Sequence, residues 1–102
     1  MPNIMTEDAE DIARKLRRDV PGRPGREPFR VELSDGRQHT IVKVWYRERW
    51  IGQYGIQRSS QSRRHNYVAE QLYLSRTDAY NLAKCPLDVD EYITILEDKG
   101  VV

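Results

Sequence analysis

The residues best suited to chemistry lie in one polar stretch, IQRSSQSRRHNYVAE, at positions 56–70. Its middle carries three arginines, three serines and one histidine, and no apolar side chain. Guanidinium and hydroxyl groups donate hydrogen bonds to phosphate oxygens, so Arg58, Arg63 and Arg64 are candidate phosphate contacts. The alternative is a solvated loop without a ligand, and the sequence favours neither.

His65 adds one catalytic alternative, because a histidine beside Arg63 and Arg64 could serve as the general acid or base of a small nuclease. A lone histidine in a polar loop is more often only a loop residue, so we expect a non-enzymatic protein. His39, His65 and Cys85 show no zinc-ligand spacing, and no glycine-rich phosphate loop is present. We therefore expect neither a metal nor a cofactor.

A second group of candidates mixes aromatic and basic side chains on two neighbouring predicted strands. Such a sheet face can stack bases and hold phosphates. Because side chains alternate along a strand, Trp45 shares a face with Lys43, whereas Tyr46 shares the other with two valines. We expect the valine face to be the core and Trp45 to be exposed. The orientation of Trp50 stays open. The candidate nucleic-acid contacts are Lys43, Trp45, Arg47, Arg49, Arg58, Arg63 and Arg64.

The charges are segregated along the chain although the net charge is only +1. Residues 14–64 hold fourteen Lys or Arg against five Asp or Glu, whereas residues 65–102 hold three against seven. A local excess of positive charge attracts polyanions regardless of net charge. The sequence therefore predicts nucleic acid, DNA or RNA, as a possible partner of the middle segment.

The elements that must position these residues begin with a helix over residues 7–19. Its apolar residues recur with helical spacing, and Thr6 is the expected N-cap. An exposed Pro/Gly/Arg connector follows at 21–28, because three prolines and two glycines exclude regular structure.

Alternating patterns then predict antiparallel strands at 29–33, 39–46, 50–57 and 67–74, joined by the turns at 34–37 and 47–49. Gly52 and Gly55 indicate a bulge or a close backbone approach in the third strand. Capping patterns at Ser75 and Asp88 predict helices at 76–84 and 89–98.

We therefore predict one α+β domain spanning residues 1–102. It has an N-terminal helix, a three- to four-stranded antiparallel meander sheet and two C-terminal helices, packed on one sheet face. The expected core residues are Ile12, Leu16, Val31, Leu33, Val42, Val44, Leu72, Leu74, Leu82, Ile93 and Leu96.

No apolar run is long enough for a membrane span, and the single cysteine fits a reducing compartment, so we expect a cytoplasmic protein without membrane contact. A non-enzymatic nucleic-acid-binding domain is the function that the sequence favours. A protein-protein interaction module or small regulatory subunit, including a homodimer, is the alternative, because the basic middle and the acidic C-terminal segment are complementary in charge.

Overall fold

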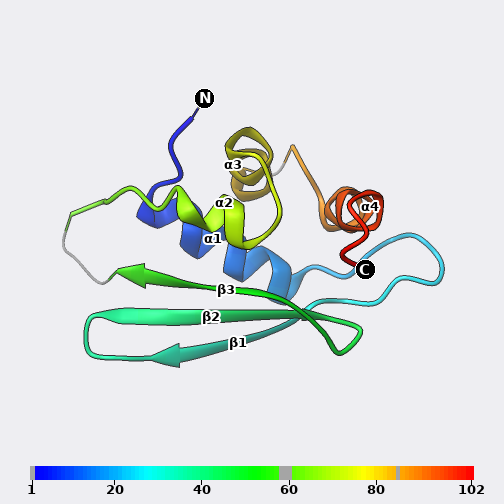
Figure 1. Cartoon of the computed structure of the whole chain (residues 1–102), viewed down its shortest axis with the longest axis horizontal. Helices are drawn as coiled ribbons and strands as arrows, with labels where there is room; N and C mark the ends of the chain where they lie inside the picture. Colours follow the sequence, from blue (N-terminus) through cyan, green and yellow to red (C-terminus); the bar gives the residue numbers. More distant parts are fainter. Residues whose placement is uncertain (1, 58–60, 85) are drawn as a thin grey trace.

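The fold is α+β, as predicted, with helices covering one face of an antiparallel sheet. A computed structural model describes residues 2–57, 61–84 and 86–102. Figure 1 shows α1 directly against the sheet, with the other helices on the same side of the strands. The elements of the described residues are, in order, α1 (Thr6–Arg18), β1 (Arg30–Asp35), β2 (His39–Tyr46), β3 (Arg49–Gln57), α2 (Tyr67–Gln71), α3 (Arg76–Lys84) and α4 (Val89–Asp98).

The sheet is a meander in the order β1-β2-β3, with both pairs antiparallel. A β-bulge interrupts the second pair, because Trp45 lies opposite Trp50 while Val44 lies opposite Gly52. The bulge adds one residue to β3, Ile51. Ile51 is buried on the helical side of the sheet, and so are Tyr54 and Ile56 further along the strand. The bulge therefore keeps Trp50 on the open face although simple alternation would group it with Tyr54, which is buried.

The prediction of a fourth strand at 67–74 is wrong, because this segment forms the short helix α2 and a turn. Its buried residues Val68, Ala69 and Leu72 have a spacing that fits one helical face. α2 packs against β3, where a Cβ atom on Gly52 would lie only 2.2 Å from the carbonyl oxygen of Gln71. Gly52 thus makes the close backbone approach that its position in a strand indicates.

The core agrees with the predicted residues except in β1. Val31 is only partly buried, and Leu33 is 47% exposed. β1 is an edge strand, and the helical layer covers the chain at its start, where Phe29 is buried, but not at its far end. The predicted core residues that are buried are Ile12, Leu16, Val42, Val44, Leu72, Leu74, Leu82, Ile93 and Leu96.

The N-terminus of α1 is held differently from the prediction, which made Thr6 the N-cap. Met5 is the N-cap, and its N–H donates to the carboxylate of Asp8 at 2.9 Å. The Thr6 hydroxyl instead accepts a hydrogen bond from the Arg63 N–H at 2.8 Å. The expected capping residues of the later helices are confirmed, since Ser75 accepts from Asp78 N–H and Asp88 accepts from Glu91 N–H.

A buried lysine joins α1 to the end of α3. The ammonium group of Lys15 donates to the carbonyl oxygens of Leu82 at 3.1 Å and Leu87 at 2.5 Å. Burying a charge is unfavourable unless it is hydrogen-bonded, so these two carbonyls make the position tolerable. α3 is thereby fixed over α1, above the covered face of the sheet.

Candidate nucleic-acid interface

Two tryptophans form an aromatic cluster on the open face of the sheet. The rings of Trp45 and Trp50 meet edge to face with their centroids 5.2 Å apart. The guanidinium carbon of Arg30 lies 4.1 Å from the centroid of the Trp45 ring. Trp45 is consequently half-buried between its two neighbours, whereas Trp50 is 45% exposed.

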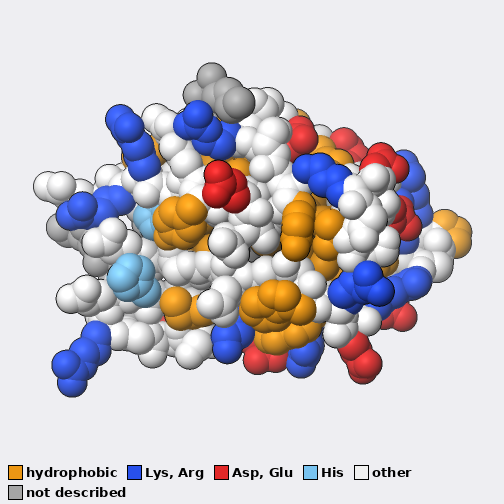
Figure 2. All heavy atoms as spheres, in the orientation of Figure 1, with side chains coloured by type: hydrophobic (Ala, Val, Ile, Leu, Met, Phe, Trp, Pro, Cys, Tyr) orange, Lys and Arg blue, Asp and Glu red, His pale blue; other side chains and the backbone are white. Residues whose placement is uncertain are grey.

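Charged side chains of both signs surround this cluster. Lys43 lies on the same face of β2 as Trp45, opposite Glu32 of β1 and Gln53 of β3. Glu32 is engaged by Arg30 in an ion pair of 3.0 Å. In Figure 2 the largest apolar cluster of the view lies in its lower middle, over the strands, and lysine and arginine side chains gather at both ends.

The turn between β2 and β3 carries two further candidate residues, Arg47 and Arg49, at the same end of the sheet as the tryptophans. Arg49 pairs with the buried Tyr46, so its side chain lies on the helical side of the sheet, and the Arg47 guanidinium lies over the Tyr46 ring. Arg47 and Glu48 both have positive φ, at 51° and 64°, which is the geometry of a tight two-residue hairpin turn. The Arg47 guanidinium donates to the carbonyl oxygen of Gly25, and that of Arg49 donates to the carbonyl oxygen of Val101 at 3.1 Å. Each guanidinium has five N–H groups, so both retain donors for a ligand.

The connector at 21–28 is less free than its composition indicates, because α4 holds it. Arg26 donates to Asp90, Thr94 and Glu97, and its side chain is only 11% exposed. The carboxylate of Asp90 also accepts the backbone N–H groups of Gly22 and Arg23, and these bonds, with that of Gly22 foremost, lower the pKa of Asp90. Arg26 therefore acts in the fold, and it is not available to phosphate.

Arg63 and Arg64 lie at the opposite end of the sheet from the 47–49 turn. The nine residues of β3 separate the two ends by about 27 Å at the usual rise per residue. The backbone of Arg63 bonds to the Thr6 hydroxyl of α1, and the backbone of Arg64 forms a β-bridge with Met5. The side chains of Arg63 and Arg64 are both exposed. Arg58 lies outside the described residues.

His65 is buried, in contrast to its expected place in a solvated loop. Its Nε2 accepts the N–H of Gln57 at 3.1 Å, and its Nδ1 lies 2.9 Å from the carbonyl oxygen of Arg63. Both contacts are satisfied by a neutral ring protonated on Nδ1. With both nitrogens occupied by backbone groups, this arrangement gives the nuclease hypothesis no support.

The structure thus brings together Lys43 and Trp45, places Arg47 and Arg49 at the same end of the sheet as Trp50, and separates them from Arg63 and Arg64. Sequence reasoning missed Arg30 and Trp50 as members of the cluster. The pairing of Arg30 with Trp45 follows from the hairpin register, and here the predicted turn at 34–37 is wrong. Gly36 pairs with His39, so the turn residues are Arg37 and Gln38, whereas a turn centred on Asp35 and Gly36 would have set Arg30 opposite Ile41. The outward position of Trp50 depends on the bulge, whose exact place has no comparable signal.

Within the described ranges, no three His, Cys, Asp or Glu side chains are grouped so that they could hold a metal ion. None of the helices described combines the length and the apolar composition that crossing a bilayer requires. Comparison with protein-family models, curated proteins and solved structures finds no match. The fold defines a small α+β domain in which helices cover one face of the sheet and the other face is open and carries the tryptophans.

Proposed function

We propose that this protein is a non-enzymatic nucleic-acid-binding domain that binds a single strand on the open face of its sheet. The observation that carries the proposal is the exposed indole of Trp50, which packs edge to face against Trp45, while Arg30 covers the Trp45 ring. An exposed aromatic ring held rigidly on a sheet is suited to stacking against an unpaired base. The base of a duplex is already stacked, so a single strand is the better ligand.

Basic side chains beside the indole supply the phosphate contacts. Lys43 and Arg30 lie beside the tryptophans on the open sheet face. Arg47 and Arg49 lie at the end of the hairpin, bonded to Gly25 and Val101 on the helical side, so a strand would reach them only where it leaves the sheet face. Contacts of this kind position the backbone of a nucleic acid without reading its sequence. We therefore expect affinity with little sequence preference and a strong dependence on salt.

We assign Arg63 and Arg64 a secondary role. They lie about 27 Å from the 47–49 turn along β3, so a short oligonucleotide stacked on Trp50 does not reach them. The acidic first turn of α1 also lies close to this end, since Ser62 donates to Glu7 at 2.8 Å. A strand long enough to follow the whole sheet would contact both ends.

An NMR titration of labelled protein with a short oligothymidine strand and with a short duplex, at low and moderate salt, tests the proposal. Trp50→Ala should weaken single-strand binding by about 1–3 kcal/mol, whereas Trp50→Phe, which keeps a ring, should retain most of it. Lys43→Gln should reduce the salt slope by up to about 0.7. The double change Arg63→Ala and Arg64→Ala should leave the slope for a short strand nearly unchanged.

Two results would end the proposal. The first is the absence of any resonance shift with either oligonucleotide at low salt. The second is a set of shifts that lies on α3 and α4 instead of on the open sheet face. A protein-protein interaction module would then be the better hypothesis, and the position of β1 at the edge of the sheet is the observation that favours it.

A further inference from the structure

The open face of the sheet carries a stretch of bare backbone at Gly55, toward the end of β3 that lies away from the tryptophans. Gly55 lies opposite Ile41 in the register of β2 and β3. A Cβ atom on Gly55 would meet side-chain atoms of His39 and Ile41 at 3.5 Å, so Gly55 faces the same side of the sheet as these two residues. Alternation along β2 places Ile41 on the face of Trp45. The open face therefore has a position without a side chain, bordered by His39 and Ile41.

Tyr67 stands at the outer edge of β3, next to this glycine. Its hydroxyl donates to the carbonyl oxygen of Gly55. Its ring centroid lies 5.7 Å from that of the buried His65, which is itself held by two backbone groups. The side chain of Tyr67 is nevertheless 41% exposed. Tyr67 is thus an exposed aromatic ring held at two points, which is the combination that distinguishes Trp50.

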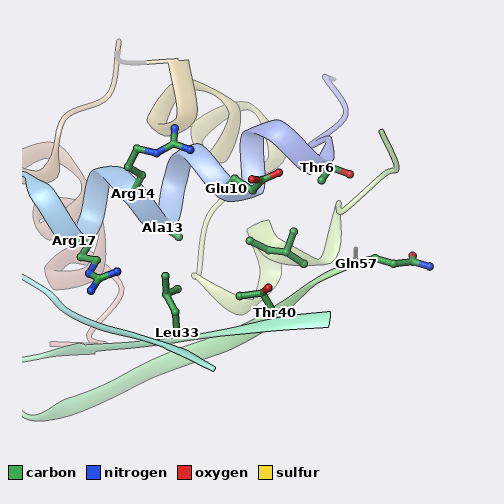
Figure 3. Close-up of a pocket in the computed structure, with 9 residues that line it drawn as sticks. Thr6, Glu10, Ala13, Arg14, Arg17, Leu33, Thr40 and Gln57 are labelled. Atoms are coloured by element: carbon green, nitrogen blue, oxygen red, sulfur yellow. The ribbon is translucent and has the colours of Figure 1, made fainter. Parts of the chain in front are cut away.

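Arg63 and Arg64 supply positive charge at this end of the sheet. Figure 3 shows Thr6, at the start of α1, and Gln57, at the end of β3, toward the same end of the cleft between α1 and the sheet. The segment 63–65 bonds to both, because it contacts the Thr6 hydroxyl and accepts the N–H of Gln57. It therefore crosses this end of the sheet, two residues beyond the glycine, and both arginine side chains are exposed there.

The spacing between Trp50 and Gly55 suits a single nucleic-acid strand. Trp50 lies opposite Trp45 and Gly55 lies opposite Ile41, so four residues of β2 separate the two positions, about 13 Å. Stacked nucleotides are about 3.4 Å apart along a strand, so this distance corresponds to about four nucleotides. Figure 2 shows the separation, with the histidine side chains toward one end of the view and the largest apolar cluster nearer its middle.

We propose that Gly55, His39 and Tyr67 form a second base-stacking site, so that one single strand occupies the open face from Trp50 to Tyr67. The inference rests on the proposed function, since it places a second unpaired base of the same strand. This base lies over Gly55, in contact with Tyr67 on one side and His39 on the other. Tyrosine and histidine rings both stack against unpaired bases.

The charges favour a nucleic-acid strand over an extended peptide as the occupant. None of the three side chains around Gly55, which are His39, Ile41 and Tyr67, carries a negative charge. A phosphate backbone that continues past Tyr67 approaches the exposed guanidinium groups of the segment 63–65. These contacts form only with a strand that reaches the second site. Because every base has a face that stacks, the second site adds affinity without sequence preference.

The length of the strand separates the second site from the first. An oligothymidine of about three nucleotides covers one site, whereas one of about eight nucleotides covers both. Tyr67→Leu should weaken binding of the longer strand by about fivefold or more and leave that of the shorter strand nearly unchanged. Tyr67→Phe, which keeps the ring, should retain most of the affinity. The control is Tyr80→Leu, the same change at a tyrosine of α3, and it should affect neither strand.

An NMR titration of the wild-type protein locates the second base. The indole of Trp50 is the larger ring, so the shorter strand occupies it first. At equal saturation of Trp50, the amide of Gly55 and the ring of Tyr67 should shift more with the longer strand than with the shorter one. The double change Arg63→Ala and Arg64→Ala should lower the salt slope of the longer strand by up to about 1.4 and leave that of the shorter strand nearly unchanged.

The outcomes distinguish this inference from the proposed function. If Trp50 responds to both strands while Gly55 and Tyr67 respond to neither, the second site is overturned and the proposed function stands. If Trp50 responds to neither strand, both fail together. Equal affinity of Tyr67→Leu and wild type for the longer strand would also overturn the second site. Circular dichroism shows whether Tyr67→Leu is folded, and if it is not, the wild-type titration decides.

Discussion

Two glycines in β3, three residues apart, should respond in opposite ways to the same substitution. A Cβ atom at position 52 would lie 2.2 Å from the carbonyl oxygen of Gln71, far inside van der Waals contact, and that oxygen belongs to backbone that cannot rotate away. A Cβ atom at Gly55 would meet only side chains of His39 and Ile41, at 3.5 Å. Forcing apart a packed contact typically lowers the free energy of unfolding by about 1–3 kcal/mol.

Replacing glycine by alanine also restricts the unfolded chain, which stabilises a protein by about 0.4–1 kcal/mol where the new side chain fits. We therefore expect Gly55→Ala to be neutral or slightly stabilising and Gly52→Ala to be destabilising by about 2 kcal/mol. Thermal denaturation followed by circular dichroism measures both, and the pair should differ by about 10–20 °C in Tm. If Gly52→Ala were as stable as Gly55→Ala, α2 would not pack on β3 as described.

Three further predictions follow from other contacts. Glu48→Gly should raise the free energy of unfolding by about 0.5–1 kcal/mol, because glycine adopts the left-handed conformation of this turn position without strain. Glu48→Ala keeps a side chain in that conformation and should give no gain. Chemical denaturation distinguishes the two variants. His65→Ala should lower the free energy of unfolding by about 1–3 kcal/mol, because the Gln57 N–H loses its acceptor. The oligonucleotide titration of this variant should be unchanged. Asp90 has a lowered pKa in the folded state, so the stability that its ionised form contributes is present above about pH 4 and is lost as the pH falls below that value. Denaturation from pH 6 to pH 3 should therefore show the advantage of wild type over Asp90→Asn shrinking at the acid end, and a constant difference would refute this role.

Most of the fold could be predicted from the sequence, because the local patterns and the tertiary packing agree. The apolar spacing of α1, the turn before His39 and the capping residues Ser75 and Asp88 each predict an element that the structure contains. The segment 67–74 was predicted to be a strand because tyrosine and valine favour strands. Only three residues, Val68, Ala69 and Leu72, show the helical spacing, which is too few to outweigh that preference. Its helical form depends on packing against Gly52, which is distant in the sequence.

The candidate site was harder to predict, because it depends on which residues the sheet places together. Alternation correctly put Trp45 on the face away from Val42 and Val44. It could not place Trp50, since a single inserted residue in β3 reverses the pattern. Nor could composition distinguish Arg26, which is held by carboxylates of α4, from the exposed Arg63. The partners of a charged residue are set by tertiary contacts that no local pattern records.

The covering of β3 by α2 and by the side chains of His65 and Tyr67 limits how far this sheet can grow. A sheet with two bare edges can add copies without end, and such growth gives filaments. Among the described residues, the outer edge of β3 is engaged at Gly55 and Gln57, so a strand that added along this side would have to displace the side chains of Tyr67 and His65.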